Sequence, residues 1–369
     1  MKLSCSKERL QYAVQTVQKA IATKTPLPIL TGIYLVAKDN ILELQATDYE
    51  VGISCTIEAD IEEPGAVVIS GRYFQEMVRK LPGESVAISS SQEDRTIKII
   101  SNNSQFNLLS LPPEEFPVLK AISSENSISI KDNILRELIR KTIFACANDE
   151  ARPIFTGALL EVDGDEIRMV ATNTHRLALK REQITASGTN IKMIIPAKIL
   201  QELARLLAND ETHDVNLSWQ KNQVGIAFNN VFINSRLIEG QFPDYNKVIP
   251  TTYSTTVRIN NDLFLDAVER VSLLAREGEY NVVKFHFQKE NVVITSNNPD
   301  IGKAYEMVPA QTTGNDVEIA FNAKYVSDIV KNIDSDEILF SLNNSLSPAN
   351  IKPWTDETYT YIITPVRTN

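Results

Sequence analysis

His175 and the two threonines that shortly precede it, Thr172 and Thr174, come nearest in type and spacing to a reactive centre. An imidazole in such a place could act as a general acid or base. The other histidines are His213 and His286, and none of the three has a metal-ligand spacing or a recognisable nucleophile partner. The pattern therefore favours a chain without catalytic activity, with an enzyme as the alternative interpretation.

The cysteines give no support to redox chemistry, and glycine-rich motifs that would support nucleotide chemistry are absent from the sequence. Cys5, Cys55 and Cys146 are widely separated and form no CxxC pair, so small buried side chains are favoured over a disulfide framework or a metal site. The sequence contains no P-loop and no GxGxxG motif, so neither nucleotide hydrolysis nor a cofactor is expected. No apolar run approaches the roughly 18 residues of a membrane span, and a cytoplasmic location is expected.

Lysine and arginine residues on amphipathic segments are the other groups that could do chemistry, namely the binding of phosphate groups. The net charge of −10 argues against nucleic acid at first sight, because binding to the phosphate backbone normally requires a basic domain. The average can, however, hide a segregation of charge, so the elements that carry these residues decide the question.

Six segments have apolar residues at helical spacing and are predicted to be helices with one buried face. In the third segment, Leu135, Leu138 and Ile139 share one side, whereas Arg136 and Arg140 lie four residues apart on the polar side. The six predicted helices cover residues 6–20, 70–80, 131–146, 197–208, 260–276 and 323–332.

The strand-rich segments between these helices repeat one pattern three times, which is the strongest signal in the sequence. The clearest copies are LPILTGIYLVAKDNILELQATDYEVGI and RPIFTGALLEVDGDEIRMVATNTHRLAL, and a fainter copy begins at Tyr280. The landmark residues Asp48, Asn173 and Asn298 lie 125 residues apart at each step. Each copy alternates apolar positions around a turn, which is typical of a β-hairpin and a neighbouring strand.

Each repeat thus has the order helix, strands, helix, strands, which predicts an α+β fold with two helices packed on antiparallel sheets. Polar stretches with little periodicity, at residues 121–126 and 250–255, fall between the repeats. Three domains are therefore expected, at residues 1–122, 127–251 and 254–369.

The six predicted helices hold 16 Lys and Arg residues against 9 Asp and Glu residues, so they carry +7 and the rest of the chain carries −17. If all six line one concave surface, that surface is basic while the outer rim is acidic. It would hold duplex DNA loosely through phosphates, and the acidic exterior would discourage nonspecific binding. Ordinary solvated helix faces are the alternative, and the helix at 260–276, with a charge of −1, weakens the trend.

Four motifs accompany the repeats in order, namely PLPIL at 26–30, ATNTHRLAL at 171–179, FPDYNKVIP at 242–250 and YIITPVR at 361–367. With the repeats, they resemble the bacterial β sliding clamps over the whole chain. That family comprises the DNA polymerase III beta subunits, which are processivity factors. The resemblance implies a head-to-tail homodimer whose six domains close a ring around duplex DNA, with helices inside and a continuous sheet layer outside. Such closure would leave no free sheet edge.

In the family, the first domain of one chain meets the third domain of the other. The matching apolar residues here are Phe106, Leu108, Leu273 and Leu274. A cleft between the second and third domains is also implied, in which the polymerase, an ATP-driven clamp loader and other proteins would dock short peptides with hydrophobic anchors. The matching cleft residues are Thr172, His175, Arg176, Leu177, Pro243, Lys247, Val248, Leu346, Ile362, Pro365 and Val366.

Several residues depart from the family pattern. Asn173 and Thr174 stand where the family often has Asp-Gly, which predicts a narrower cleft floor. Thr364 stands where an apolar residue is common, and Pro348 where a small polar residue is usual. These departures bear on which peptides the cleft prefers.

For DNA, the family's contacts match Lys24, Arg72, Arg79 and Arg152, whereas acidic Asp149 stands where some relatives have a glutamine. Together with basic helix residues, the expected DNA-binding set is Lys24, Arg72, Arg79, Arg136, Arg140, Arg152, Lys198 and Arg205. Binding would be independent of DNA sequence, because phosphates carry no base identity. A scaffold that binds proteins through the cleft without encircling DNA is the remaining alternative.

Overall fold

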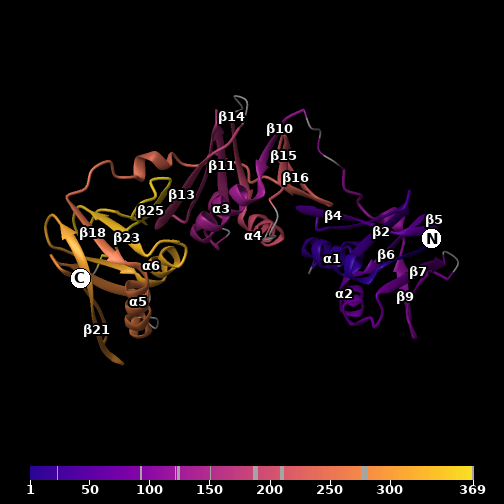
Figure 1. Ribbon diagram of the computed structural model, residues 1–369, viewed down its shortest axis with the longest axis horizontal. Helices are drawn as coiled ribbons and strands as arrows, with labels where there is room; N and C mark the ends of the chain where they lie inside the picture. Colours follow the sequence, from indigo (N-terminus) through magenta and orange to yellow (C-terminus); the bar gives the residue numbers. More distant parts are fainter. Residues whose placement is uncertain are drawn as a thin grey trace. The chain divides into compact units, whose positions relative to one another are not determined.

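The structure is a computed structural model that describes residues 1–22, 24–91, 94–120, 122, 125–149, 151–185, 190–207, 212–275 and 281–367. The chain forms two compact units. The first comprises Met1–Asn133 and Arg205–Leu237, and the second comprises Ile134–Ala204 and Ile238–Asn369. Figure 1 shows both units and labels many of their elements.

Strands of the first unit form one antiparallel sheet. They are β1 (Lys2–Ser6), β2 (Gly32–Lys38), β3 (Ile41–Thr47), β4 (Val51–Glu58), β5 (Asp60–Glu63), β6 (Gly65–Ser70), β7 (Ser85–Ser91), β8 (Thr96–Ser101), β9 (Ser104–Leu111), β10 (Ser127–Lys131), β15 (Asp214–Gln220), β16 (Gln223–Phe228) and β17 (Val231–Arg236). Among the described residues their order is β10-β15-β16-β17-β4-β3-β2-β6-β9-β8-β7-β1-β5. Because β17 pairs with β4, strands of two successive sequence repeats share this sheet.

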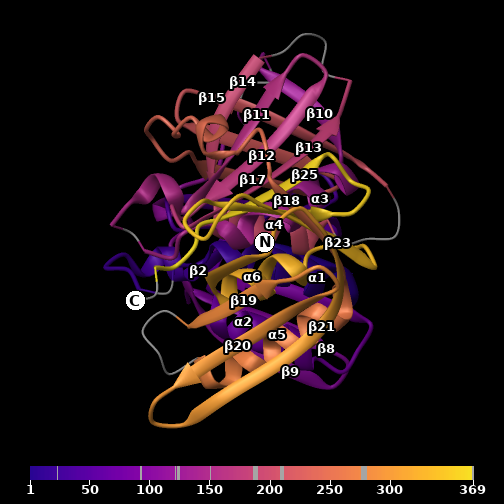
Figure 2. The same ribbon diagram turned by 90° about the vertical axis from the view of Figure 1, so that its left-hand side faces the viewer.

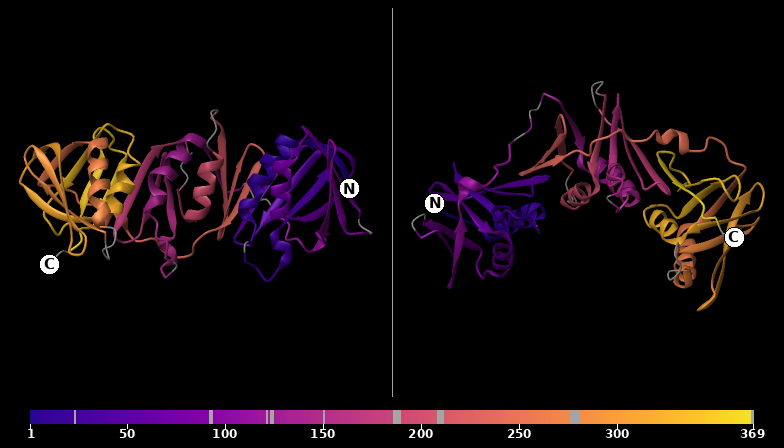
Figure 3. Two further views of the ribbon diagram at one scale, coloured as in Figure 1. Left: turned by 90° about the horizontal axis from the view of Figure 1, so that it is seen from below. Right: turned by 180° about the vertical axis from the view of Figure 1, so that it is seen from behind.

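Two helices of the first unit, α1 (Lys7–Val17) and α2 (Gly71–Lys80), pack against each other and against strands of this sheet (Figure 3). Helix α2 buries Phe74, Met77 and Val78 and exposes Arg79 and Lys80. The two cations lie in its last turn, where the negative end of the helix dipole stabilises them. The predicted amphipathic helices of the first repeat are thereby confirmed.

Strands of the second unit form another antiparallel sheet. They are β11 (Gly157–Asp163), β12 (Glu166–Thr172), β13 (Arg176–Gln183), β14 (Asn190–Pro196), β18 (Thr255–Asn260), β19 (Val282–Phe287), β20 (Asn291–Asn298), β21 (Gly302–Thr313), β22 (Val317–Asn322), β23 (Glu337–Leu342), β24 (Ala349–Pro353) and β25 (Tyr359–Ile363). Their order among the described residues is β14-β11-β12-β13-β25-β24-β23-β18-β21-β20-β19-β22. Strands β20 and β21 form a long hairpin (Figure 2). The pairing of β13 with β25 brings the C-terminal strand beside the second repeat.

Four helices belong wholly or mainly to the second unit: α3 (Asp132–Thr142), α4 (Ala197–Leu206), α5 (Asn261–Ala275) and α6 (Ala323–Val330). Helix α5 contacts α6 and packs Phe264 against the rings of Phe285 and Phe340, with centroids 5.9 and 5.2 Å apart. These helices match the predicted segments, and the predicted α+β class with helices on antiparallel sheets is confirmed. Tyr280, and Ala121, Ser123 and Ser124 within the predicted linker, lie outside the described residues.

The landmark residues of the repeats sit at equivalent turns. The side chains of Asp48 and Asn173 each accept hydrogen bonds from the backbone N–H groups two and three residues further on. The residues that follow them, Tyr49 and Thr174, have φ angles of 75° and 76°. Asn298 accepts one such bond, of 3.0 Å, from the residue two positions further on. The first two repeats thus share their turn chemistry closely, and the third shares part of it.

Candidate functional site

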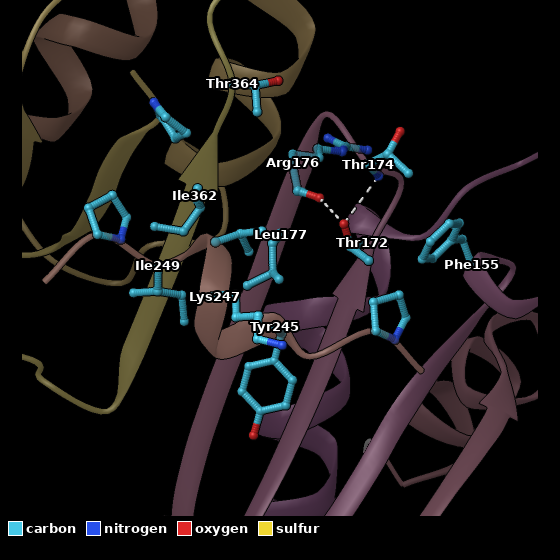
Figure 4. Close-up of a pocket in the computed structure, with 14 residues that line it drawn as sticks. Phe155, Thr172, Thr174, Arg176, Leu177, Tyr245, Lys247, Ile249, Ile362 and Thr364 are labelled. Carbon is cyan, nitrogen blue, oxygen red and sulfur yellow. Dashed lines mark hydrogen bonds between the residues drawn. The ribbon is translucent and has the colours of Figure 1, made fainter. Parts of the chain in front are cut away.

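The candidate site is built around the turn that joins β12 to β13. Thr172 Oγ1 accepts a hydrogen bond from the Thr174 N–H (3.2 Å) and donates one to the Arg176 carbonyl (2.6 Å), as Figure 4 shows. Asn173 Oδ1 accepts from the N–H groups of His175 and Arg176 at 3.1 and 3.0 Å. These bonds hold Thr174 in a left-handed conformation that is costly for a β-branched residue.

Arg176, the first residue of β13, is buried and anchors this turn. Its Nη1 lies 2.5 Å from Asp328 Oδ2 on α6, and its Nη2 donates to the carbonyl of Phe144 in the short helix η4 (Ile143–Ala145). Its Cζ lies 4.4 Å from the ring centroid of Tyr325 and 5.6 Å from that of Phe144. Because a charge withdrawn from water must be paired, these contacts hold β13 to η4 and α6.

A pocket of about 570 Å³ opens beside the turn (Figure 4). Leu177 on β13 and Ile362 on β25 are register partners, and they form an apolar wall beneath which a buried hydrophobic cluster continues. The short helix η6 (Tyr245–Val248) and Ile249 also contribute to the lining, and Tyr245 and Ile249 belong to or pack against the same cluster. The volume of the pocket, and its largely apolar lining with a few polar groups, are typical of a ligand-binding site. The lining residues are Phe155, Thr172, Thr174, Arg176, Leu177, Pro243, Tyr245, Lys247, Val248, Ile249, Pro250, Pro348, Ile362 and Thr364.

The structure brings most of the predicted cleft residues to this pocket and leaves others outside its lining. Those that line it are Thr172, Arg176, Leu177, Pro243, Lys247, Val248 and Ile362, and those that do not are His175, Leu346, Pro365 and Val366. The His175 carbonyl accepts from the N–H and the hydroxyl of Thr364, both at 2.9 Å. Leu346 is 67% exposed on a turn capped by the Asn344 side chain. Of the four departures from the family pattern in the cleft, Thr174, Pro348 and Thr364 line the pocket, whereas Asn173 does not.

Sequence reasoning missed four lining residues, Phe155, Tyr245, Ile249 and Pro250. The Tyr245 hydroxyl donates a 2.6 Å hydrogen bond to the buried carboxylate of Glu161. Burial raises the pKa of Glu161, but hydrogen bonds from Lys192 and Tyr245 outweigh it and leave the pKa below its ordinary value. The motif at residues 242–250 contains three of the four missed residues and was the signal that could have found them.

The contacts of His175 in the structure are made by its backbone, whose N–H donates to Asn173 and whose carbonyl accepts from Thr364. The hydroxyl proton of Thr172 is donated to a backbone carbonyl, so this oxygen is not poised as a nucleophile. The described residues contain no group of three or more His, Cys, Asp or Glu side chains that could hold a metal ion. Burial raises the pKa of the Cys5, Cys55 and Cys146 thiols to about 12, which keeps them protonated and inert. No described helix is long and apolar enough to cross a membrane.

Most of the predicted DNA-binding residues are exposed. In the first unit these are Lys24, Arg72, Arg79 and Arg205, and in the second unit they are Arg136, Arg152 and Lys198. Arg72, Arg79, Arg136 and Lys198 have no ion-pair partner among the residues that the structure describes. Arg152 donates a 3.5 Å hydrogen bond to the Thr174 hydroxyl, which places its guanidinium near the pocket.

Arg140 differs from these residues because its guanidinium is held by carboxylates. It donates to both oxygens of Asp334, with Nη1 3.1 Å from Oδ1, and to Glu137 at 3.0 Å. Lys141 is buried beside it and lies 2.8 Å from the same Asp334 carboxylate. Arg140 chiefly, and Lys141 with it, hold the pKa of Asp334 well below its ordinary value. The polar side of α3 therefore includes an arginine that is committed to protein contacts.

The predicted dimer residues lie on or near strands whose edges are partly unpaired among the described residues. Strand β9 is bonded to β8 along its length, whereas β6 meets it only at its last two residues. In the second unit, β21 is bonded to β20, whereas β18 meets only its C-terminal part. Phe106 on β9 and Leu273 on α5 are 41% and 56% exposed, and Leu108 and Leu274 are half-buried. Unpaired edges of this kind are ready to pair with another strand.

Comparisons with known proteins give one consistent result. Family models described as the N-terminal, central and C-terminal domains of the DNA polymerase III beta subunit match residues 1–120, 129–244 and 246–367. The beta sliding clamp of Staphylococcus epidermidis is 37% identical over 359 residues, which are 95% of each chain. The crystal structure of the DNA polymerase sliding clamp from Bacillus subtilis has a TM-score of 0.96 and 36% identity, with 100% of each chain covered. That of the DNA polymerase III beta subunit from Thermotoga maritima has a TM-score of 0.93 and 30% identity, also over 100% of each chain.

Proposed function

Because the chain belongs to the bacterial β sliding clamp family, the beta subunits of DNA polymerase III, we propose that it encircles duplex DNA and tethers the replicative polymerase to it. Processivity then comes from topology, because a closed ring can slide along DNA without dissociating from it. Three clamp domains are proposed at residues 1–122, 127–251 and 254–369, because the landmark residues recur every 125 residues. The chain acts as a binding protein without catalytic activity and works in the cytoplasm.

Ring closure uses a head-to-tail homodimer. The unpaired stretches of β9 and β21 support this proposal, because pairing between two copies would satisfy both edges. Phe106 and Leu108 of one copy would then pack against Leu273 and Leu274 of the second. Light scattering is expected to give twice the chain mass of 41.3 kDa. A single-chain mass at micromolar concentration would contradict closure.

Exposed cations on the helices contact DNA phosphates without reading the base sequence. The absence of an ion-pair partner for Arg72, Arg79, Arg136 and Lys198 among the described residues supports this role, since each can release counterions from DNA. We expect the loaded protein to stay on closed circular DNA and to slide off after the circle is cut. Equal retention on circular and linear DNA would overturn encirclement and favour a scaffold that binds proteins alone. The chain lacks a P-loop, so a separate ATP-driven loader opens the ring.

The pocket beside the turn at 172–176 docks short peptide segments of the polymerase, the loader and other partners. The observation that carries this assignment is the apolar wall of Leu177 and Ile362 within an open pocket of about 570 Å³. Such a pocket takes the hydrophobic anchors of a peptide, while Thr172, Thr174 and Lys247 at its wall offer polar contacts.

A matched pair of leucines tests the pocket. Leu177 and Leu179 are each 4% exposed and belong to one buried cluster, but only Leu177 lines the pocket. Replacing either residue with alanine removes similar packing. We expect Leu177→Ala to weaken binding of a fluorescent polymerase-derived peptide about tenfold, equivalent to about 1.4 kcal/mol. Leu179→Ala should leave the affinity near that of the unaltered chain. Unchanged affinity in the Leu177→Ala protein would remove the assignment.

A further inference from the structure

Two residues of α6 lie outside the pocket lining yet contact the turn that shapes it. Asp328 pairs with Arg176, and Tyr325 lies against the same guanidinium. We propose that Asp328 and Tyr325 are positioning residues for the docking pocket, which hold the turn at 172–176 in the arrangement that binds peptide. The inference rests on the proposed docking function and extends it to side chains that no bound peptide need touch.

The contacts join α6 to the turn at two separate points. Asp328 Oδ2 lies 2.5 Å from Arg176 Nη1, and the Arg176 side chain is only 6% exposed. The Tyr325 hydroxyl accepts a 3.2 Å hydrogen bond from Asn173 Nδ2. The Tyr325 carbonyl in turn accepts a 2.9 Å bond from the hydroxyl of Tyr361 on β25. Both the start of β13 and the side chain that organises the turn are therefore fixed to α6.

These contacts bear directly on the residues that line the pocket. The Arg176 carbonyl accepts the hydroxyl proton of Thr172, and the next residue along β13 is Leu177. A movement of Arg176 therefore displaces a polar and an apolar member of the pocket wall together. The wall keeps its shape only while the Arg176 guanidinium stays against the rings of Phe144 and Tyr325.

The charge of Asp328 is what keeps the guanidinium in place. Without it, Arg176 would hold a buried positive charge beside neutral groups such as the Phe144 carbonyl and the Tyr361 hydroxyl. Its Nε already has no hydrogen-bond partner among the described residues. A buried charge without a counter-ion is strongly unfavourable, so the side chain would leave the aromatic site for water and take the turn with it. If the competent arrangement falls to about a tenth of molecules, the apparent Kd for peptide rises about tenfold.

Asp334 provides a matched control. It lies in the segment after α6 and pairs with Arg140 and Lys141, so Asp334→Asn also removes an aspartate that binds cations of the second repeat. Neither it nor its partners line the pocket or bond to the turn at 172–176 among the described residues. A general loosening of the second unit would affect peptide binding in both variants, whereas positioning of the turn depends on Asp328 and not on Asp334.

The experiment measures binding of a fluorescent polymerase-derived peptide by anisotropy, and thermal unfolding, for the full-length dimer and its variants. We expect Asp328→Asn to raise the Kd about tenfold, Asp328→Glu to restore most of the affinity, and Asp334→Asn to leave the Kd within twofold while lowering the Tm. Restoration by the longer carboxylate separates a charge-held turn from lost packing. Tyr325→Phe should raise the Kd less, because the ring over Arg176 remains.

The experiment distinguishes failure of the positioning role from failure of peptide docking at the pocket. If the unaltered chain does not bind the peptide, docking at this pocket fails, and this inference fails with it. If the unaltered chain binds and Asp328→Asn binds equally well, docking stands and the positioning role is overturned. Equal weakening by Asp328→Asn and Asp334→Asn would also overturn it, because the effect would then follow general stability.

Discussion

Arg136 and Arg140 lie four residues apart on α3, and replacing each with glutamine should give opposite results. Arg136 is exposed and has no ion-pair partner among the described residues, whereas Arg140 is held by Asp334 and Glu137. The two substitutions remove the same charge from one helix and change its helical propensity equally. Any difference between them therefore comes from what each guanidinium contacts.

The expected magnitudes follow from these contacts. Each phosphate contact that is lost lowers the slope of log K against log salt concentration by about 0.9, so Arg136→Gln should reduce the slope by about that amount. Arg140 is partly solvated, so its ion pairs are worth less than buried ones. Its two bonds to Asp334 place it at the upper end of surface pairs, at about 1 kcal/mol. Arg140→Gln should then lower the Tm by about 2–4 °C.

The assay is fluorescence anisotropy of a labelled duplex titrated with each dimer at several salt concentrations, beside thermal unfolding of the same samples. Arg136→Gln should change the salt slope and leave the Tm within error, and Arg140→Gln should do the reverse. An equal fall in slope for both variants would refute the reasoning, because the carboxylates would then not withhold Arg140 from DNA. An unchanged slope for Arg136→Gln would count against a phosphate contact by this helix.

Three further predictions concern stability. Thr174→Gly should raise the free energy of unfolding by about 1 kcal/mol, because glycine adopts a φ of 76° without strain. Tyr49→Gly should raise it too, because Tyr49 occupies the equivalent position in the first repeat, with a φ of 75°. Chemical denaturation measures both changes. The folded-state pKa of Asp334 lies below the unfolded value near 3.9, so its stabilisation is present above that pH and is lost as the pH falls through the folded pKa. Asp334→Asn should therefore lower the Tm at pH 7, and the difference from the unaltered chain should shrink below about pH 4. Gly52→Ala should cost about 1–2 kcal/mol, because a Cβ there would lie 2.1 Å from Leu119 Cδ2, and adding Leu119→Ala should recover part of that loss.

The helices and the order of elements could be predicted because their signals are local. Leu135, Leu138 and Ile139 are all buried, as helical spacing requires, and Arg136 on the same helix is exposed. Helical periodicity needs only a few turns of chain to be visible. The α+β class follows once such helices alternate with strand patterns, so this level of the fold was available from the sequence.

The pocket could be predicted only in part, because its wall depends on a long-range pairing. Leu177 faces Ile362 only because β13 pairs with β25, and no local pattern specifies which distant strand a given strand will join. Phe155 escaped sequence reasoning because it lies on a short helical turn at the start of the second repeat copy and outside the four motifs that carry the family resemblance. Resemblance to a family supplied the residues that the pairing brings together, and physical pattern alone would not have done so.

Some basic residues of the predicted helices form ion pairs with acidic residues elsewhere in the chain. Arg140 and Lys141 contributed to the basic excess of α3, yet both contact Asp334, which lies in the segment after α6 and was counted with the acidic remainder of the chain. The pair of Arg176 and Asp328 at the pocket has the reverse arrangement, because its aspartate lies on helix α6 and its arginine on strand β13. Part of the segregation between helices and the rest of the chain is therefore internal ion pairing and is not available to DNA. Only cations without such partners can release counterions, so the salt slope of single variants measures the DNA-facing charge more directly than any sum over the sequence.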